Sequence, residues 1–163
     1  MFGGIAFVFI VVFMSIFISM SNSDIEELIV CSSNNESSYI PQSLCNYYLI
    51  NHRGTKGDVQ LLESRSGISF VFGVVDEKKR NKLFDFLVEK NIDINKVSSI
   101  DGFSPLHAAV LEKDEKLVKK LLELGADKSI ISTSANQTAL IMAKKLQGDG
   151  QGDYKEIIKL LSD

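Results

Sequence analysis

The most reactive side chains of the sequence are its two cysteines and its two histidines. Cys31 and Cys45 are separated by a mostly polar segment. In an exported protein, an even number of cysteines at short spacing predicts a disulfide, and two buried reduced thiols are the alternative. Closing a loop of about 15 residues would stabilise the fold by about 3 kcal/mol. We therefore predict that export oxidises this pair and joins two helices, 24–31 and 41–52.

The remaining reactive residues show no spacing that points to catalysis. His107 has no cysteine or second histidine at ligand spacing, and His52 is expected to be a surface or cap residue. Asp149 and Asp153 lack the alternation of acidic ligands that a calcium loop needs. The sequence contains no phosphate loop, nucleophile elbow or His-Glu-x-x-His motif. Its net charge of −3 gives no electrostatic case for nucleic acid. We predict a protein that is not an enzyme, with no catalytic residue, metal or cofactor and no nucleic-acid partner.

The elements that position these residues begin with Asp101-Gly-Phe-Ser-Pro-Leu-His-Ala-Ala109, which predicts a turn followed by a short helix. Ser104 can cap this helix with its hydroxyl, and Pro105 suits the first helical position, where no intrahelical N–H bond is lost. Apolar pairs within 117–122 predict a second, amphipathic helix. Gly125 stands where that helix must end in a left-handed residue.

This unit resembles one ankyrin repeat, and segments on both sides resemble further copies of it. Gly67-Ile-Ser69 and Asn136-Gln-Thr138 correspond to Gly102-Phe-Ser104. The resemblance implies an all-α solenoid of about three helix-turn-helix repeats over residues 67–163. It also implies that His107 braces neighbouring turns through hydrogen bonds.

The resemblance divides the chain into three parts. Three repeats are near the lower limit for stability, so residues 24–66 are expected to form a helical cap on the repeats of 67–163. Residues 1–23 precede the cap as a signal peptide or an N-terminal membrane anchor. The repeat register predicts that the side chains buried between the helices are Leu83, Leu87, Leu106, Ala109, Leu117, Leu121, Leu140, Ala143 and Leu160.

The N-terminal segment contains no charged residue over 2–20 and consists mainly of Phe, Ile, Val and Met. Its apolar centre, Ile5–Ile18, has the length of a signal-peptide hydrophobic region, and small residues within 19–23 have the spacing of a cleavage site. A retained inner-membrane anchor is the alternative, since such a segment can span a hydrocarbon core of about 30 Å. A buried helix is the third interpretation, and it fits poorly because every face is apolar. Both membrane interpretations place the rest of the chain outside the cytoplasm, in the periplasm or secreted, in agreement with acidic residues at 24–27.

Ankyrin stacks bind partners along a concave face of turn tips and inner helices, so the resemblance implies which side chains point outward. In the middle repeat three of these positions are apolar, Ile100, Phe103 and Leu111. Such side chains would form an exposed patch with an acidic rim, the anatomy of a protein-binding surface. The predicted partner-binding residues are Ile68, Asp76, Glu77, Ile100, Asp101, Phe103, Leu111, Glu112 and Gln137.

The size, export signal and repeat type are similar to those of exported bacterial ankyrin-repeat proteins that act as immunity proteins against toxins, including effectors of type VI secretion. The resemblance implies a periplasmic module that binds and neutralises a cognate toxin. A periplasmic adaptor or stress-protection protein that binds another envelope protein is the second hypothesis. An enzyme with a site in the cap is the third. The membrane would be contacted only through residues 2–20, if this segment is retained.

Overall fold

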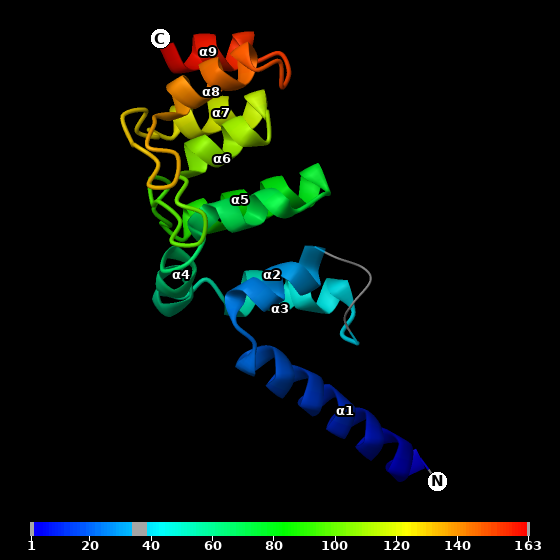
Figure 1. The fold of residues 1–163 in the computed structure, drawn as a ribbon. Helices are drawn as coiled ribbons and strands as arrows, with labels where there is room; N and C mark the ends of the chain where they lie inside the picture. The colour runs from blue at the N-terminus through cyan, green and yellow to red at the C-terminus, as the bar shows by residue number, and fades with distance from the viewer. Residues whose placement is uncertain (1, 34–38, 163) are drawn as a thin grey trace.

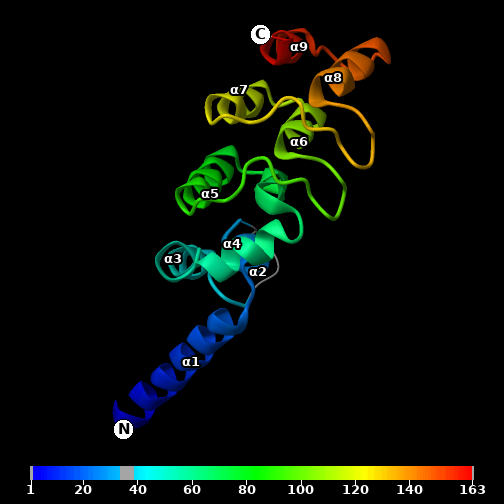
Figure 2. The same cartoon turned by 90° about the vertical axis from the view of Figure 1, so that its left-hand side faces the viewer.

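The computed structural model describes residues 2–33 and 39–162, which form an elongated stack of helices with α1 projecting from one end (Figure 1). In the described residues the only β-pairing is an isolated bridge between Ile131 and Thr138, so the predicted all-helical class is confirmed. Figure 2 shows α5, α7 and α9 in one row and α6 and α8 in a second row. The elements are α1 (Phe2–Asn22), α2 (Ile25–Ser33), α3 (Gln42–His52), α4 (Lys56–Glu63), the 3₁₀-helix η1 (Gly67–Gly73), α5 (Glu77–Glu89), α6 (Pro105–Leu111), α7 (Glu115–Glu123), α8 (Ala139–Gly148) and α9 (Lys155–Ser162).

The middle repeat consists of α6 and α7 as predicted, with one difference where it begins. Pro105 is the first residue of α6, but Ser104 makes no capping bond. The Ser104 hydroxyl lies instead 2.7 Å from Nδ1 of His107. Asp114 caps α7, because its carboxylate accepts a hydrogen bond at 3.0 Å from an N–H in the first turn. Gly125 ends the repeat with φ 89°, the left-handed conformation that glycine adopts most easily.

The burial of the apolar pairs confirms the repeat register. Leu87, Leu121 and Ala143 are 0 % exposed, and α6 packs against both α7 and α8. Leu140 and Leu160 depart from the prediction, since both pack against the core but are only partly buried. The other predicted core residues are also buried, namely Leu83, Leu106, Ala109 and Leu117.

The first repeat differs from the expected helix pair because its inner helix is the 3₁₀-helix η1, packed against α5. Glycine at both ends and β-branched and aromatic residues between them are weak formers of α-helix, and 3₁₀ geometry suits such short pieces. Phe70-Val-Phe72 also stands where an ankyrin repeat has Pro-Leu-His. Ile68 and Val71 are nevertheless 0 % exposed, so η1 fills the same layer of the core as α6.

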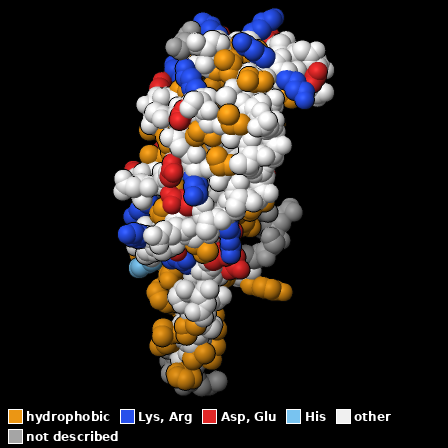
Figure 3. Space-filling model, turned by 60° about the vertical axis from the view of Figure 1, so that its left-hand side comes forward, with side chains coloured by type: hydrophobic (Ala, Val, Ile, Leu, Met, Phe, Trp, Pro, Cys, Tyr) orange, Lys and Arg blue, Asp and Glu red, His pale blue; other side chains and the backbone are white. Residues whose placement is uncertain are grey.

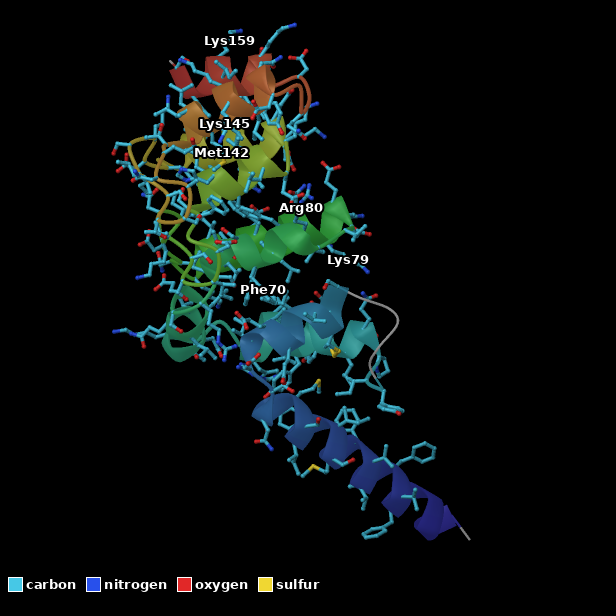
Figure 4. All side chains as sticks on the ribbon, in the orientation of Figure 1. Phe70, Lys79, Arg80, Met142, Lys145 and Lys159 are labelled. Atoms are coloured by element: carbon cyan, nitrogen blue, oxygen red, sulfur yellow. A yellow bond between two sulfur atoms is a disulfide. The ribbon has the colours of Figure 1, made fainter. Side chains whose placement is uncertain are left out.

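The cap consists of α2, α3 and α4, and a disulfide joins its first two helices. Cys31 on α2 is bonded to Cys45 on α3, and their Cα atoms are 5.9 Å apart, within the usual range for a disulfide. Figure 4 shows this bond beside α3. The structure therefore contains the predicted disulfide and the two helices it joins. Residues 34–38, most of the polar segment between the cysteines, lie outside the described residues.

A buried ion pair fixes the junctions around the cap. Arg53 Nε donates to Asp58 Oδ1 at 3.0 Å, and its Nη1 donates to the Ser23 carbonyl oxygen at 2.6 Å. Asp58 also accepts the N–H of Thr55 at 3.0 Å, which completes a capping box at the start of α4. Burial alone would raise the pKa of Asp58, but the hydrogen bonds from Arg53 and Thr55 outweigh it and lower that pKa. The pair thus ties the segment between α1 and α2 to α4.

The C-terminal part of α1 packs against α3. The ring of Phe17 meets Tyr48 edge to face with centroids 5.3 Å apart, and Met20 is only 2 % exposed. Side chains are described from Phe7 onward. Within the described part of the chain, no helix is long and apolar enough to cross a membrane.

Candidate functional site

Two turns of the same design project from one side of the repeat stack (Figures 1 and 2). Ser98 N–H donates to the Phe103 carbonyl oxygen at 2.9 Å, and Ser132 N–H donates to the Gln137 carbonyl oxygen at 3.0 Å. Both serine hydroxyls also accept backbone N–H groups of their own turn, from Asp101 at 3.3 Å and Ala135 at 3.0 Å. A serine whose side chain bonds to its own backbone fixes a turn locally. The side chains at these tips are therefore held in defined positions.

A buried histidine links the two turns. His107 is 1 % exposed, and its Nε2 lies 2.9 Å from the Gln137 carbonyl oxygen. A carbonyl oxygen only accepts hydrogen bonds, so Nε2 carries the proton, and Nδ1 accepts from the Ser104 hydroxyl. Burial lowers the pKa of His107, and the bond to Gln137 offsets this only in part, so the ring is neutral near pH 7. This confirms the bracing role that the sequence resemblance implied.

Four predicted partner-binding residues belong to these turns, and the structure exposes them unequally. Ile100 is 70 % exposed, and Asp101 beside it is exposed as well. Phe103 and Gln137 are half-buried. The Phe103 ring stacks on His107 with centroids 6.1 Å apart. Phe103 therefore supports the turn and contributes less free surface than the sequence suggested.

Four other predicted residues lie at the opposite end of the helices from the turns. Leu111 is the last residue of α6, 44 % exposed, and Glu112 follows it. Glu77 and Glu112 line one shallow pocket of about 340 Å³. Asp76 caps α5. Figure 4 shows Lys79 and Arg80 at this end of α5.

Two ion pairs join α5 to the start of α7 at this end of the helices. Glu77 pairs with Lys116 on α7 at 3.1 Å, and Arg80 pairs with Asp114 at 2.8 Å. Ile100 precedes α6 and Leu111 ends it, so the expected single patch with an acidic rim would span the length of that helix and stays a prediction. A seven-residue helix is about 10 Å long.

Ile68 is buried, contrary to the prediction from the sequence. It was predicted to point outward, but it is 0 % exposed. The alignment of the repeats gives Ile68 the position that Phe103 has in the middle repeat, at the tip of a regular turn. Because η1 begins at Gly67, Ile68 lies inside a 3₁₀-helix and faces the core.

Two exposed apolar residues of the last repeat were not predicted from the sequence. Ile131 is 56 % exposed in the turn before α8, and Ile141 is 53 % exposed in the first turn of α8. Ile141 has the position in its repeat that His107 has in the middle repeat. This correspondence is the signal from which its exposure could have been predicted. His107 is covered by the turn of the next repeat, whereas Ile141 belongs to the last described repeat. Figure 3 shows hydrophobic side chains in separate patches on the face that it presents.

The turn side therefore offers Ile100, Ile131 and Ile141 on a firmly bonded backbone. The Thr133 N–H donates to the Gly102 carbonyl oxygen at 3.0 Å, so the two turns also lie side by side. In the described residues, no group of three or more His, Cys, Asp or Glu side chains is placed to hold a metal ion. The chemistry that this arrangement supports is burial of apolar side chains against another surface.

A family model for ankyrin repeats in three copies matches residues 74–163. This is more than half of the chain, and it includes all of α5 to α9. No curated protein and no solved structure matches the chain. Repeats of this type stack into extended surfaces that bind other proteins. The chain belongs to the ankyrin-repeat family.

Proposed function

We propose that this protein binds a protein partner through the turn side of its repeats, with Ile100, Ile131 and Ile141 as the main contacts. The observation that carries the proposal is that more than half of the surface of each isoleucine is exposed on a backbone fixed by hydrogen bonds. An apolar side chain held away from the core gains little for folding, whereas a partner can bury it. Asp101 would contribute polar contacts at the rim. Glu77 and Glu112, at the far end, would not take part.

We further propose that the partner is a toxin or effector and that the protein is a periplasmic immunity protein. The support is the resemblance to exported ankyrin-repeat proteins of this type, together with the uncharged segment 2–20. The Cys31–Cys45 disulfide is typical of a compartment outside the cytoplasm. A binding module of this kind needs no catalytic residue, because it acts by covering the active site or entry surface of the toxin.

The proposal is tested by expressing the protein with the product of each neighbouring reading frame directed to the periplasm. One neighbour should be toxic alone, and the wild-type protein should restore growth and co-purify with it. Ile100→Asp with Ile131→Asp should abolish protection. Val75→Asp is the matched control, because Val75 is 98 % exposed but lies just before α5, away from the turns. Protection that survives the double substitution, or that is lost equally in the control, would contradict the proposed surface.

A further inference from the structure

The end of α1 is part of the folded cap. Met20 is 2 % exposed and belongs to the main hydrophobic core, and Ile16 packs against that core. The Phe17 ring contacts both Tyr48 and His52, with centroids 5.3 Å and 6.1 Å away. A segment that is discarded after export would gain nothing from such packing.

The possible cleavage positions are also held in helical structure. Ser21 lies within α1, and its hydroxyl donates to the Ile18 carbonyl oxygen at 2.8 Å. Ser23 N–H donates to the Ser19 carbonyl oxygen at 3.1 Å. Removal of residues 1–23 would take away the carbonyl oxygen that accepts from Arg53 at 2.6 Å. It would also uncover the face of α3 on which Phe17 lies.

The N-terminal part of α1 is apolar and exposed in every direction. Each residue from Phe7 to Met14 is between 50 % and 70 % exposed. Eight consecutive helical residues cover more than two turns and so point to all sides. A groove on a protein covers one stripe of a helix, whereas a helix that is apolar all round is suited to an apolar medium.

Two exposed tyrosines of the cap line cavities together with residues of α1. Tyr39 is 107 % exposed and lines a cavity of about 540 Å³ together with Ser19. Tyr47 is 59 % exposed and lines a second cavity, of about 260 Å³, together with Phe13. Exposed tyrosines concentrate where hydrocarbon meets water, because the ring is apolar and the hydroxyl is polar. Asp24, the first charged residue of the chain, follows directly on the cap side.

We infer that α1 is retained in the mature protein and that its exposed part is embedded in the hydrocarbon of a lipid bilayer, with Tyr39 and Tyr47 at the lipid–water boundary. This inference refines the proposed export, since it selects retention of residues 1–23 over their cleavage, and it requires the exposed part of α1 to enter the bilayer without crossing it. The contacts with α3 fix the direction of α1 relative to the cap. The repeats then extend away from the lipid surface, since α1 and the last repeat lie at opposite ends of the molecule (Figure 1).

The test uses the absence of tryptophan from the sequence. Phe9→Trp places a single reporter on the exposed part of α1, and Val75→Trp places the matched reporter on an exposed site of the repeats. The full-length variants are reconstituted into phosphatidylcholine–phosphatidylglycerol vesicles with brominated or ordinary acyl chains. The bromines should remove most of the fluorescence of Phe9→Trp and leave that of Val75→Trp unchanged. Equal quenching of the two variants would overturn the inference. Shielding of the Phe9→Trp fluorescence from water in the absence of lipid would also overturn it, because a second copy of the chain would then cover α1.

A second measurement addresses retention directly. The intact mass of a C-terminally tagged protein from the cell envelope should include the residues before Asp24. A product that begins at or near Asp24 would overturn the inference. Neither readout requires the protein partner, so failure here is distinguishable from failure of the proposed binding function.

Discussion

The cap and the repeats are held together by different means. The cap relies on a few single strong links, above all the Cys31–Cys45 disulfide and the buried Arg53–Asp58 pair. The repeats rely on the same small contacts made again in each unit, such as the serine-bonded turns and the packed leucines. A region built by repetition can lose one small contact and keep its architecture, whereas the cap depends on each link. The comparison also separates roles, since the regular part presents the proposed partner surface and the irregular part connects it to α1.

The largest effect should come from a charge placed in the repeat core. Leu121 is 0 % exposed, and Leu121→Asp would bury an unpaired carboxylate in a domain stabilised by about 5–15 kcal/mol. We expect this variant to lose its cooperative thermal transition in circular dichroism. Leu124→Asp is the control on the same segment, because Leu124 is 43 % exposed. Similar melting of both variants would show that the repeat register is wrong.

Loss of the disulfide should have the next largest effect, and it should act on the cap. Cys31→Ser with Cys45→Ser should lower the free energy of unfolding by about 3 kcal/mol in the chain-entropy model. Reduction of the wild type should reproduce the loss, and reduction should not change the double variant. Hydrogen exchange should locate the faster opening in α2 and α3. Faster opening spread equally over α6 to α9 would contradict the separation of cap and repeats.

Two glycines allow a sharper test of how the turns are joined. Gly102 and Gly125 have φ of 74° and 89°, and alanine in this region costs about 1–2 kcal/mol. A Cβ atom at Gly102 would also lie 2.5 Å from Thr133 Oγ1 and 2.9 Å from Ser134 N. A Cβ atom at Gly125 would meet no described atom within 4 Å other than those of its chain neighbours. Gly102→Ala should therefore destabilise the protein more than Gly125→Ala in urea titrations. Equal losses would mean that the two turns are not in tight contact.

The smallest effect should be a pH dependence that originates from His107. Its pKa is lowered by burial from the ordinary value of 6.5, so the unfolded chain binds a proton more readily than the folded one. Stability is therefore complete above pH 6.5 and decreases as the pH falls below it, by at most about 1.4 kcal/mol per pH unit for one proton. His107→Gln should remove this slope between pH 6.5 and 5, while His52→Gln should keep it. An unchanged slope in His107→Gln would assign the effect to other groups.

The sequence predicted the parts of the fold that repeat. Leu121 and Ala143 could be placed in the core because their positions recur at repeat spacing, and the cysteine pair was visible from count and spacing. Ile68 was misplaced because correspondence between repeats assumes a regular turn, and a 3₁₀-helix changes which way a side chain faces. Ile141 was missed because its exposure depends on its place at the end of the described stack. The packing of α1 on α3 has no periodic signal, since it depends on contacts such as Phe17 with Tyr48.

The central claim is that the turn side of the repeats binds a protein, and calorimetric titration with the identified partner tests it most directly. An apolar anchor typically contributes about 2 kcal/mol or more when it is truncated, which corresponds to more than a tenfold change in Kd. We predict that Ile100→Ala with Ile131→Ala weakens binding by more than tenfold while the melting temperature stays close to wild type. Val75→Ala should bind as the wild type does. An unchanged Kd in the stably folded double variant would contradict the account.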